Sequence, residues 1–322
     1  MNKIIIVIAV IFCTNLYSQE IKTEDWITDL NFLKTELIKK HKNLFFKISK
    51  QDFELELNKI INNLEKDNDK TTFFKINQLL AKVGDSHTGA STSHLLKGAK
   101  TIPMLLSWFE DGLYVSGTSK DNYEILGKKL VSINGYKLER VLDSLKTLFV
   151  DENIGIVNKK TAQLIRTKSI LKYFNFSKEN DDVYHLELMN SKGITSSYKL
   201  KEIIVSNKQR KNNISIKVNN EKPFYRNGSG KSFKEKYYPE DKIYIIQYNK
   251  CISKETVEEY GNKEFAFKYP SFEEFEAKVL KTIKNEKIDK LIFDIRFNQG
   301  GSSYLAENLI DKICKNKKIN KE

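Results

Sequence analysis

The sequence has few cysteines and no apolar run long enough to cross a membrane. Only three cysteines occur in 322 residues, and neither a Cys-x-x-Cys pair nor a His/Cys cluster is present, which argues against a structural zinc site. Cys13 lies in an N-terminal apolar run, so Cys251 and Cys314 are the two that could pair, although nothing in the sequence places them close together. The run from Ile4 to Cys13 is half of the roughly 20 residues that a spanning helix needs.

Residues 1–18 are instead expected to be a signal peptide. Lys3 supplies the positive start, Ile4 to Cys13 supplies the apolar centre, and polar residues follow. Phe12 is too large for a lipoprotein cleavage site before Cys13, so we expect no lipid anchor. The sequence therefore predicts export to the periplasm or to the outside of the cell, without a stable membrane anchor.

No segment concentrates the positive charge. The formal net charge is +13, with 30% charged and 40% hydrophobic residues, and the lysines are spread along the whole chain. A nucleic-acid-binding protein is expected to gather its charge on one helix or arm. We therefore predict no nucleic-acid partner and interpret the charge as solvated surface, with an anionic partner as the alternative.

The first part of the chain predicts a helical bundle. Three apolar stripes with helical spacing lie between Thr23 and Val83, which predicts three helices. The stripes are Trp26, Leu30, Leu33 and Leu37, then Phe53, Leu57, Ile60 and Leu64, and finally Phe73, Ile76, Leu80 and Val83. Ser49 with Asp52 predicts a capping box, and Gly84 predicts a left-handed end to the third helix.

A β-rich domain and then a βαβ unit are expected after the bundle. Alternation begins near Ile102, and Asn134-Gly135 predicts a tight turn followed by a helix through Val141 and Leu145. Residues 151–193 show no clear pattern, and residues 207–236 are expected to form a long loop or an irregular hairpin. Residues 243–246 and 290–295 predict parallel strands, joined by a helix capped by Ser271 and Glu274; another helix is expected over Ser302 to Lys315.

Two segments carry residues suited to catalysis. His87, in Gly84-Asp85-Ser86-His87-Thr88, follows the third predicted helix, where an imidazole could act as a general base. The alternative is a loop of capping residues that contains a histidine by chance. The strand Leu291 to Ile295 leads into Gly300 and Gly301, whose N–H groups could form an oxyanion hole or an anion site. The alternative there is an ordinary strand-to-helix turn that needs glycine.

Taken together, these segments resemble the tail-specific, or C-terminal processing, serine peptidases, especially their tricorn-like branch. The matching segments are Gly84 to Thr88 and Asp294 to Gly301, in the family's order. Leu126 to Gly135 resembles part of a PDZ-like domain, and Tyr244 to Cys251 resembles the strand that opens the catalytic core. The resemblance implies an α/β (α+β multidomain) chain. Its parts would be a signal peptide (1–18), a helical bundle (19–98), a PDZ-like domain (99–205) and an incomplete crotonase-like core (206–322).

The resemblance also implies roles for individual residues. His87 would be the general base and Ser86 would support it, while Gly300 or Gly301 would supply an oxyanion-hole N–H. Asp85 and Thr88 would support His87, and Asp294, Arg296 and Asn298 would hold the glycine turn. The substrate would be a peptide or protein held by its C-terminal end, without a metal or organic cofactor.

The family's nucleophilic serine lies some tens of residues after the two glycines, and its supporting glutamate lies later still. Gly301 is 21 residues from Glu322, so neither residue is expected in this sequence, and Ser302 or Ser303 is better interpreted as a helix cap. Residues 1–322 are therefore expected to be inactive alone. A non-catalytic exported peptide-binding protein and an inactive gene fragment are the alternatives.

Two further patterns are not expected to be functional. Gly228 to Ser232 is similar to part of a phosphate-binding loop, but Tyr225 stands where that motif needs its first glycine. His41, His94 and His185 are expected to be isolated, because no carboxylate cluster accompanies them in the sequence.

Overall fold

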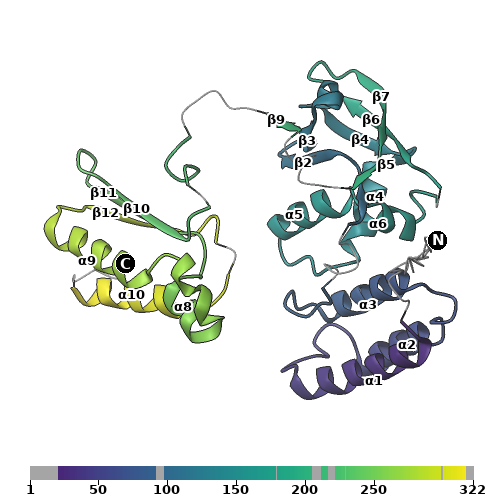
Figure 1. Ribbon diagram of the computed structural model, residues 1–322, viewed down its shortest axis with the longest axis horizontal. Coiled ribbons are helices and arrows are strands. Elements are labelled where there is room, and N and C mark those ends of the chain that lie inside the picture. The colour runs from purple at the N-terminus through teal and green to yellow at the C-terminus, as the bar shows by residue number, and fades with distance from the viewer. Residues whose placement is uncertain are drawn as a thin grey trace, which may run out of the picture. The chain divides into compact units, whose positions relative to one another are not determined.

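The computed structural model describes residues 21–91, 98–178, 180–204, 212–216, 222–228, 230–298 and 300–316. The predicted signal peptide and His94 lie outside these ranges. The chain divides into two compact units, Met1–Lys217 and Val218–Glu322, and each is described by itself (Figure 1). No helix among the described residues is long and apolar enough to cross a membrane.

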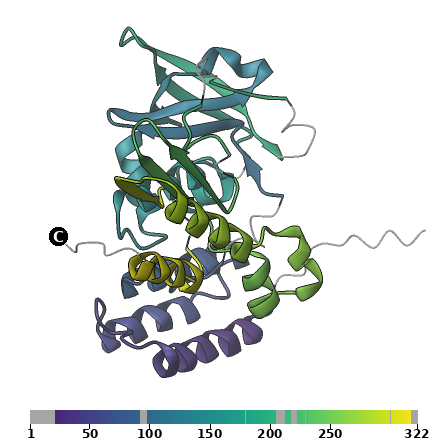
Figure 2. The same ribbon diagram turned by 90° about the vertical axis from the view of Figure 1, so that its left-hand side faces the viewer.

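The first unit begins with three helices, α1 (Thr23–Lys40), α2 (Lys50–Ile61) and α3 (Asp69–Val83). They confirm the helices predicted from the three apolar stripes, because those residues bury one face of each helix in a common core. Buried members of this core include Trp26, Leu30, Phe53, Leu57, Ile76, Leu80 and Val83. Figure 2 shows the three helices forming one layer, below the strands of the same unit.

The helix ends follow from local sequence. The Ser49 hydroxyl accepts the Asp52 N–H at 3.0 Å at the start of α2, and the Asn68 side chain accepts the Thr71 N–H at 2.9 Å at the start of α3. Gly84 ends α3 with φ of 81°, a left-handed conformation that glycine adopts without a Cβ penalty. The predicted Ser49 and Gly84 caps are confirmed.

The rest of the first unit is an antiparallel sheet with helices against it. Its main strand order is β2-β3-β4-β6-β7, with β5 paired to β4 and β9 paired to β3. Its strands are β2 (Met104–Phe109), β3 (Gly112–Ser119), β4 (Lys129–Ile133), β5 (Tyr136–Lys137), β6 (Val183–Met189), β7 (Thr195–Lys201) and β9 (Asn213–Ser215). A separate pair joins β1 (Lys100–Thr101) to β8 (Ile203–Ile204), and the short helix η1 spans Lys120–Ile125.

Three helices complete this part: α4 (Leu138–Lys146), α5 (Ile154–Leu164) and α6 (Lys168–Tyr173). Helix α4 confirms the prediction through Val141 and Leu145, whereas α5, α6 and β6 fill the stretch that showed no clear pattern. One continuous core joins the sheet to these helices and includes Phe74 from α3. The PDZ-like label stays a prediction.

The predicted Asn134-Gly135 turn is confirmed between β4 and β5. Both residues have positive φ, 50° and 80°, as a two-residue hairpin turn requires. The Asn134 side chain is held on both sides, because its Nδ2 donates to the Phe176 carbonyl at 2.8 Å and its Oδ1 accepts the His185 N–H at 2.9 Å. The turn is therefore fixed to β6 and to the end of the α6 segment.

The second unit is a three-stranded sheet with helices. Strand β10 (Phe233–Tyr238) is antiparallel to β11 (Ile243–Tyr248), which is parallel to β12 (Lys290–Asp294). The connection between the parallel strands contains α8 (Lys254–Tyr260), η2 (Lys263–Lys268) and α9 (Phe272–Asn285), and α10 (Tyr304–Asn316) follows β12. Both α9 and α10 lie on the same side of the sheet (Figure 1).

This unit confirms the parallel strand pair with its intervening helix. The Ser271 hydroxyl accepts the Glu274 N–H at 3.2 Å, as the predicted cap of α9 requires. The predicted loop over residues 207–236 is wrong at its end, because β10 begins at Phe233 and pairs with β11. The polar composition of this strand conceals it, since three of its six residues are Lys or Glu and only Phe233 is buried. The crotonase-like label stays a prediction.

Candidate functional site

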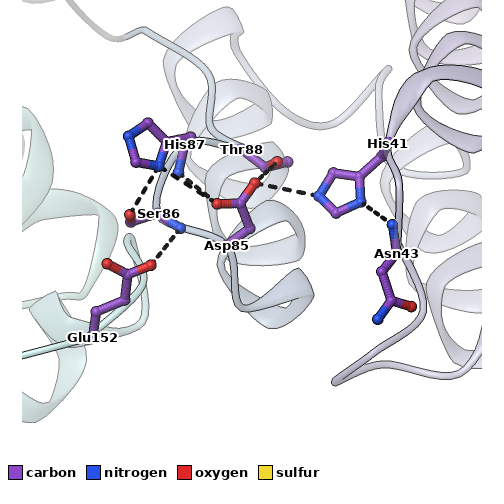
Figure 3. Close-up of polar contacts among 7 residues, drawn as sticks. All are labelled: His41, Asn43, Asp85, Ser86, His87, Thr88 and Glu152. Atoms are coloured by element: carbon purple, nitrogen blue, oxygen red, sulfur yellow. Dashed lines mark hydrogen bonds and ion pairs between the residues drawn. The ribbon is translucent and has the colours of Figure 1, made fainter. Parts of the chain in front are cut away.

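The His87 ring projects from a turn that α3 positions. Helix α3 ends at Gly84, and the Thr88 N–H donates to the Asp85 carbonyl at 3.0 Å, which closes the turn. Within this turn the Asp85 carboxylate accepts the His87 N–H at 3.0 Å and the Thr88 hydroxyl at 2.7 Å (Figure 3). The structure therefore brings together the four residues predicted in this segment.

The His87 side chain is 95% exposed, and its Nδ1 faces the chain. The Ser86 Oγ lies 3.4 Å from His87 Nδ1, and the nearer Asp85 oxygen lies 3.7 Å from the same atom (Figure 3). A neutral imidazole whose Nδ1 is held in this way can present Nε2 as a proton acceptor. The geometry is that of a histidine available for general-base chemistry.

Glu152 is a member of this cluster that the sequence did not predict. Its Oε1 accepts the Ser86 N–H at 3.1 Å, across 66 residues of chain. Hydrogen bonds from the Ser86 hydroxyl and backbone lower the pKa of Glu152, and the nearby His87 lowers it further. Glu152 is exposed and precedes α5, so only the folded chain shows its proximity to Ser86.

His41 was expected to be isolated, and this prediction is wrong. Its Nε2 lies 3.3 Å from the Asp85 Oδ2, and its Nδ1 accepts the Asn43 N–H at 3.1 Å (Figure 3). The carboxylate of Asp85 thus contacts both histidines. The His87 N–H and the Thr88 hydroxyl are the main reasons that the pKa of Asp85 lies below its usual value, with a smaller contribution from His41.

The other histidine within the described ranges, His185, is exposed on β6. No group of three or more His, Cys, Asp or Glu side chains that could hold a metal occurs in the described part of the chain. Cys251 and Cys314 are both free thiols.

The predicted glycine turn lies in the second unit, after β12. Arg296 donates to Asp294 through two nitrogens, Nε at 2.9 Å and NH2 at 2.6 Å, and its own N–H donates to the same carboxylate at 3.0 Å. The paired guanidinium is the main reason that the pKa of Asp294 lies below its usual value. The guanidinium also lies over the Tyr225 ring, 4.0 Å from its centre. These contacts fix the start of the turn.

Asn298 holds the remainder of the turn. Its Nδ2 donates to the Tyr248 carbonyl at 3.1 Å, and its Oδ1 accepts the Gly300 N–H at 2.7 Å. Gly301 pairs with Cys251 in a parallel bridge and has φ of 119°. The Gly300 N–H is thus already bound within the turn, and the bridge to Cys251 holds Gly301.

The two predicted groups of residues therefore belong to different units. Asp85, Ser86, His87 and Thr88 form one cluster in the first, whereas Asp294, Arg296, Asn298, Gly300 and Gly301 form another in the second. Their assigned catalytic roles stay predictions.

The first unit also contains a hollow beside the His87 turn. A cavity of about 550 Å³ lies between α2, α3 and the residues after α4, with Ile60, Leu79 and Phe149 among its apolar lining. A second cavity of about 540 Å³ shares Glu56, Ala81, Lys82 and Asp151 with the first and extends to Gly84. The second cavity therefore reaches Gly84, the residue before Asp85 in the segment that carries His87.

No protein-family model matches the sequence, and no curated protein matches it. Among solved structures, the chain is similar to CPAF, a chlamydial serine protease with a tail-specific-protease-like fold. The complex of mature CPAF with lactacystin matches with a TM-score of 0.54 at 15% identity, covering 89% of this chain and 59% of CPAF. Mature CPAF alone matches with a TM-score of 0.51 at 14% identity, covering 87% and 56%.

A mutant of CPAF matches with a TM-score of 0.54 at 14% identity, covering 88% of this chain and 57% of that chain. This chain thus spans less than two thirds of the CPAF chains that it matches. At such identities the likeness shows the fold, which is peptidase-like and mixes helices with several sheets. It supports the sequence resemblance at the level of the family and does not reach the tricorn-like branch.

Proposed function

Starting from a peptidase-like fold, we propose that this chain is part of a serine peptidase of the tail-specific kind, tricorn-like branch, with His87 as its general base. The observation that carries the proposal is the exposed His87 ring, whose Nδ1 lies 3.4 Å from the Ser86 hydroxyl and 3.7 Å from the Asp85 carboxylate. A base in this state can take a proton from an attacking hydroxyl and return it to the leaving amine.

The other predicted residues have supporting roles in this proposal. Ser86 and Glu152 orient the His87 ring, while Asp85 and Thr88 hold the backbone of its turn. Gly300 or Gly301 donates its N–H to the oxyanion of the tetrahedral intermediate. Asp294, Arg296 and Asn298 keep the glycine turn in place through the contacts described above.

The nucleophile is a serine that the family resemblance places some tens of residues after the glycine turn. Ser302 and Ser303 immediately precede α10, and the Ser303 hydroxyl donates to the Glu307 carboxylate at 2.5 Å. This hydrogen bond ties the Ser303 side chain to α10, and the family resemblance assigns no catalytic role to either residue. We propose that residues 1–322 alone do not hydrolyse peptides.

The proposed substrate is a peptide or protein. The sheet of the first unit, in its PDZ-like interpretation, holds the C-terminal end of the substrate by strand addition. The protein acts after export, in the periplasm or outside the cell, in agreement with the predicted signal peptide. The reaction requires neither a metal nor an organic cofactor, because the base and the backbone donors supply its chemistry.

One observation favours a second candidate, a non-catalytic exported peptide-binding protein. In the described part of the chain, the hydroxyl at hydrogen-bonding distance from the His87 ring belongs to Ser86, the adjacent residue. A residue so close in sequence lies at Nδ1 as a support and cannot also attack a substrate from the Nε2 side. If the whole reading frame contains no further serine segment, this candidate replaces the enzyme; an inactive gene fragment is the remaining alternative.

The test is to sequence the gene past codon 322 and to assay the product of the complete reading frame. In that product, His87→Ala should lower the turnover rate by at least about 10²-fold, the usual contribution of a general base, and leave substrate binding nearly unchanged. Full turnover by this variant would refute the role of His87.

Residues 1–322 alone should neither hydrolyse peptides nor react with a fluorophosphonate probe, because the described residues contain no serine activated in the way that the proposed mechanism requires. Mass spectrometry of the labelled protein checks this directly. Stoichiometric labelling at Ser302 or Ser303 would identify one of them as the nucleophile and contradict the assignment made above.

A further inference from the structure

His41 links the end of helix α1 to the turn that carries His87. We propose that His41 is a positioning residue: through the Asp85 carboxylate it fixes the backbone of that turn and therefore the direction of the His87 ring. This inference rests on the proposed function, in which His87 is the general base.

His41 is held more firmly than its partner histidine. It immediately follows α1, where its N–H donates to the Leu37 carbonyl at 2.9 Å, and its side chain is only 17% exposed. Its Nδ1 accepts the Asn43 N–H at 3.1 Å, so the proton of the neutral ring lies on Nε2. That proton points at Asp85 Oδ2, 3.3 Å away. The contact with Asn43 alone therefore fixes the tautomer of the ring and the direction of its Nε2–H.

The Asp85 carboxylate connects the His41 ring to the backbone of His87. Its Oδ2 accepts from His41 and from the Thr88 hydroxyl, whereas its Oδ1 accepts the His87 N–H (Figure 3). The planar carboxylate cannot rotate without losing bonds on both sides. Because His41, at the end of α1, holds Oδ2, it also fixes the position of Oδ1, which accepts the His87 N–H.

The His87 side chain needs such a support, because exposure leaves it little packing. A ring that is 95% exposed is free to populate several rotamers, and only a fraction of them points toward a reacting hydroxyl. The hydrogen bonds to its turn reduce this freedom, which raises the share of molecules with a correctly placed base. A single partly exposed hydrogen bond by itself adds little to stability, so we expect the effect of His41 on His87 to exceed its effect on the fold.

The test uses amide hydrogen exchange by NMR on the 322-residue chain. His41→Phe keeps a ring of similar shape but cannot donate to Asp85, so the His87 amide should exchange about threefold to tenfold faster, the range of one net hydrogen bond. His41→Gln, whose side-chain amide can donate to the same oxygen, should restore most of the protection. Amides of α1, α2 and α3 should be unchanged and serve as the control for folding.

An unchanged His87 amide in His41→Phe, with the helices intact, would overturn the proposal. If that variant does not fold, His41→Leu takes its place in the comparison with His41→Gln. Adding Asp85→Asn to His41→Gln then tests the same hydrogen bond from the side of its acceptor. Equal loss of protection in His41→Gln and His41→Leu would also overturn it, because the donor would then be irrelevant.

Activity provides a second readout in the product of the complete reading frame. There His41→Phe should lower kcat about tenfold with KM unchanged, and His41→Gln should recover it. The exchange experiment does not require turnover. A protein without peptidase activity would therefore refute the proposed function while the exchange data still decide the role of His41.

Discussion

Single residues decide the backbone geometry at the two predicted segments. Gly84 and Gly301 both have positive φ, and both lie next to residues with proposed roles. A Cβ on Gly301 would lie 2.7 Å from the Cys251 Cβ and 3.3 Å from its carbonyl oxygen. Gly300 also has positive φ, at 87°, but a Cβ there would meet nothing within 4 Å. A comparison of Gly300 with Gly301 therefore separates the effect of backbone strain from the effect of steric contact.

We predict that Gly301→Ala destabilises the second unit more than Gly300→Ala does. Gly300→Ala should cost about 1–2 kcal/mol, the strain of a left-handed alanine. Gly301→Ala should cost more, because the strained backbone must also move away from Cys251. Urea unfolding of both variants, followed through protection of the α9 amides, gives the comparison.

Cys251→Gly provides the matched control, since it removes the Cβ that the new methyl group would meet. Combined with Gly301→Ala, it should recover the steric part of the loss and leave the strain. Equal costs for the two alanine variants would show that strain alone accounts for the effect.

The residues of the site could be predicted only in part. His87, Ser86, Asp85 and Thr88 are adjacent in sequence, so a turn after a helix was sufficient to place them together. His41 and Glu152 contact the same turn across 44 and 66 residues of chain, respectively. No local pattern marks such contacts, since both residues lie in polar stretches where a solvated side chain is the ordinary expectation.

At the scale of elements, the start of helix α9 has two caps. Besides Ser271, the Glu255 carboxylate of α8 accepts the Ser271 hydroxyl at 2.6 Å and the Phe272 and Glu273 N–H groups at 2.8 and 3.3 Å. Partial burial raises the pKa of this carboxyl, but the hydrogen bonds outweigh it and lower the pKa to about 2. The positive end of the helix dipole also stabilises a negative charge at the helix N-terminus.

We predict a pH-dependent contribution of Glu255 to the stability of the second unit. Because its folded pKa is below its usual value of 4.5, the stabilisation is fully present above that pH and is lost as the pH falls toward about 2. Glu255→Gln should cost about 1 kcal/mol at pH 7, on the scale of a helix cap, and less at pH 3. Urea unfolding at the two pH values measures the difference.

Glu258→Gln is the control on the same helix, because Glu258 is exposed and lies 3.9 Å from Lys254. It should change stability by no more than about 0.5 kcal/mol at either pH. A cost for Glu255→Gln that is the same at pH 3 and pH 7 would contradict the capping role.

The elements themselves were predictable where packing follows one period. Helices α1, α2, α3 and α9 each bury a regular apolar stripe, and β11 and β12 are short apolar runs bounded by polar residues. Helices α5 and α6 were missed because their buried residues, such as Thr161, Ile170 and Leu171, do not form a long stripe. Strand β10 was missed because its lysines gave it the composition of a loop.

At the scale of the whole molecule, the second unit has a sheet edge that is partly uncovered. In the described part of the second unit, β12 pairs only with β11 and so has one open edge. Its Leu291 and Ile292 side chains are 39% and 43% exposed, and Ile295 beyond it is 59% exposed. An apolar strand edge of this kind can pair with another molecule.

We predict that the 322-residue chain self-associates and that residues 243–315 exchange amide hydrogens faster than residues 26–83. The first group depends on a small sheet with an open edge, whereas the second is a closed helical core. Hydrogen exchange and sedimentation velocity measure the two effects. Ile292→Lys should reduce association, because a charged residue on an edge strand opposes pairing.

Lys290→Ala, at the start of the same strand, should not reduce association. Strong and equal protection of both regions in a monomer would refute this prediction. The second unit would then be stable as it stands, and the peptide-binding candidate would gain support.

The tight turn at Asn134 and Gly135 has a consequence for the chemical ageing of the protein. An Asn-Gly pair in a flexible chain deamidates readily, because the glycine nitrogen can reach the asparagine side-chain carbonyl carbon and form a cyclic imide. In the folded chain both ends of that side chain are engaged, by the Phe176 carbonyl and by the His185 N–H. The amide cannot turn toward Gly135 while these bonds last, so conversion of Asn134 to aspartate would mark the molecules in which this hairpin has opened.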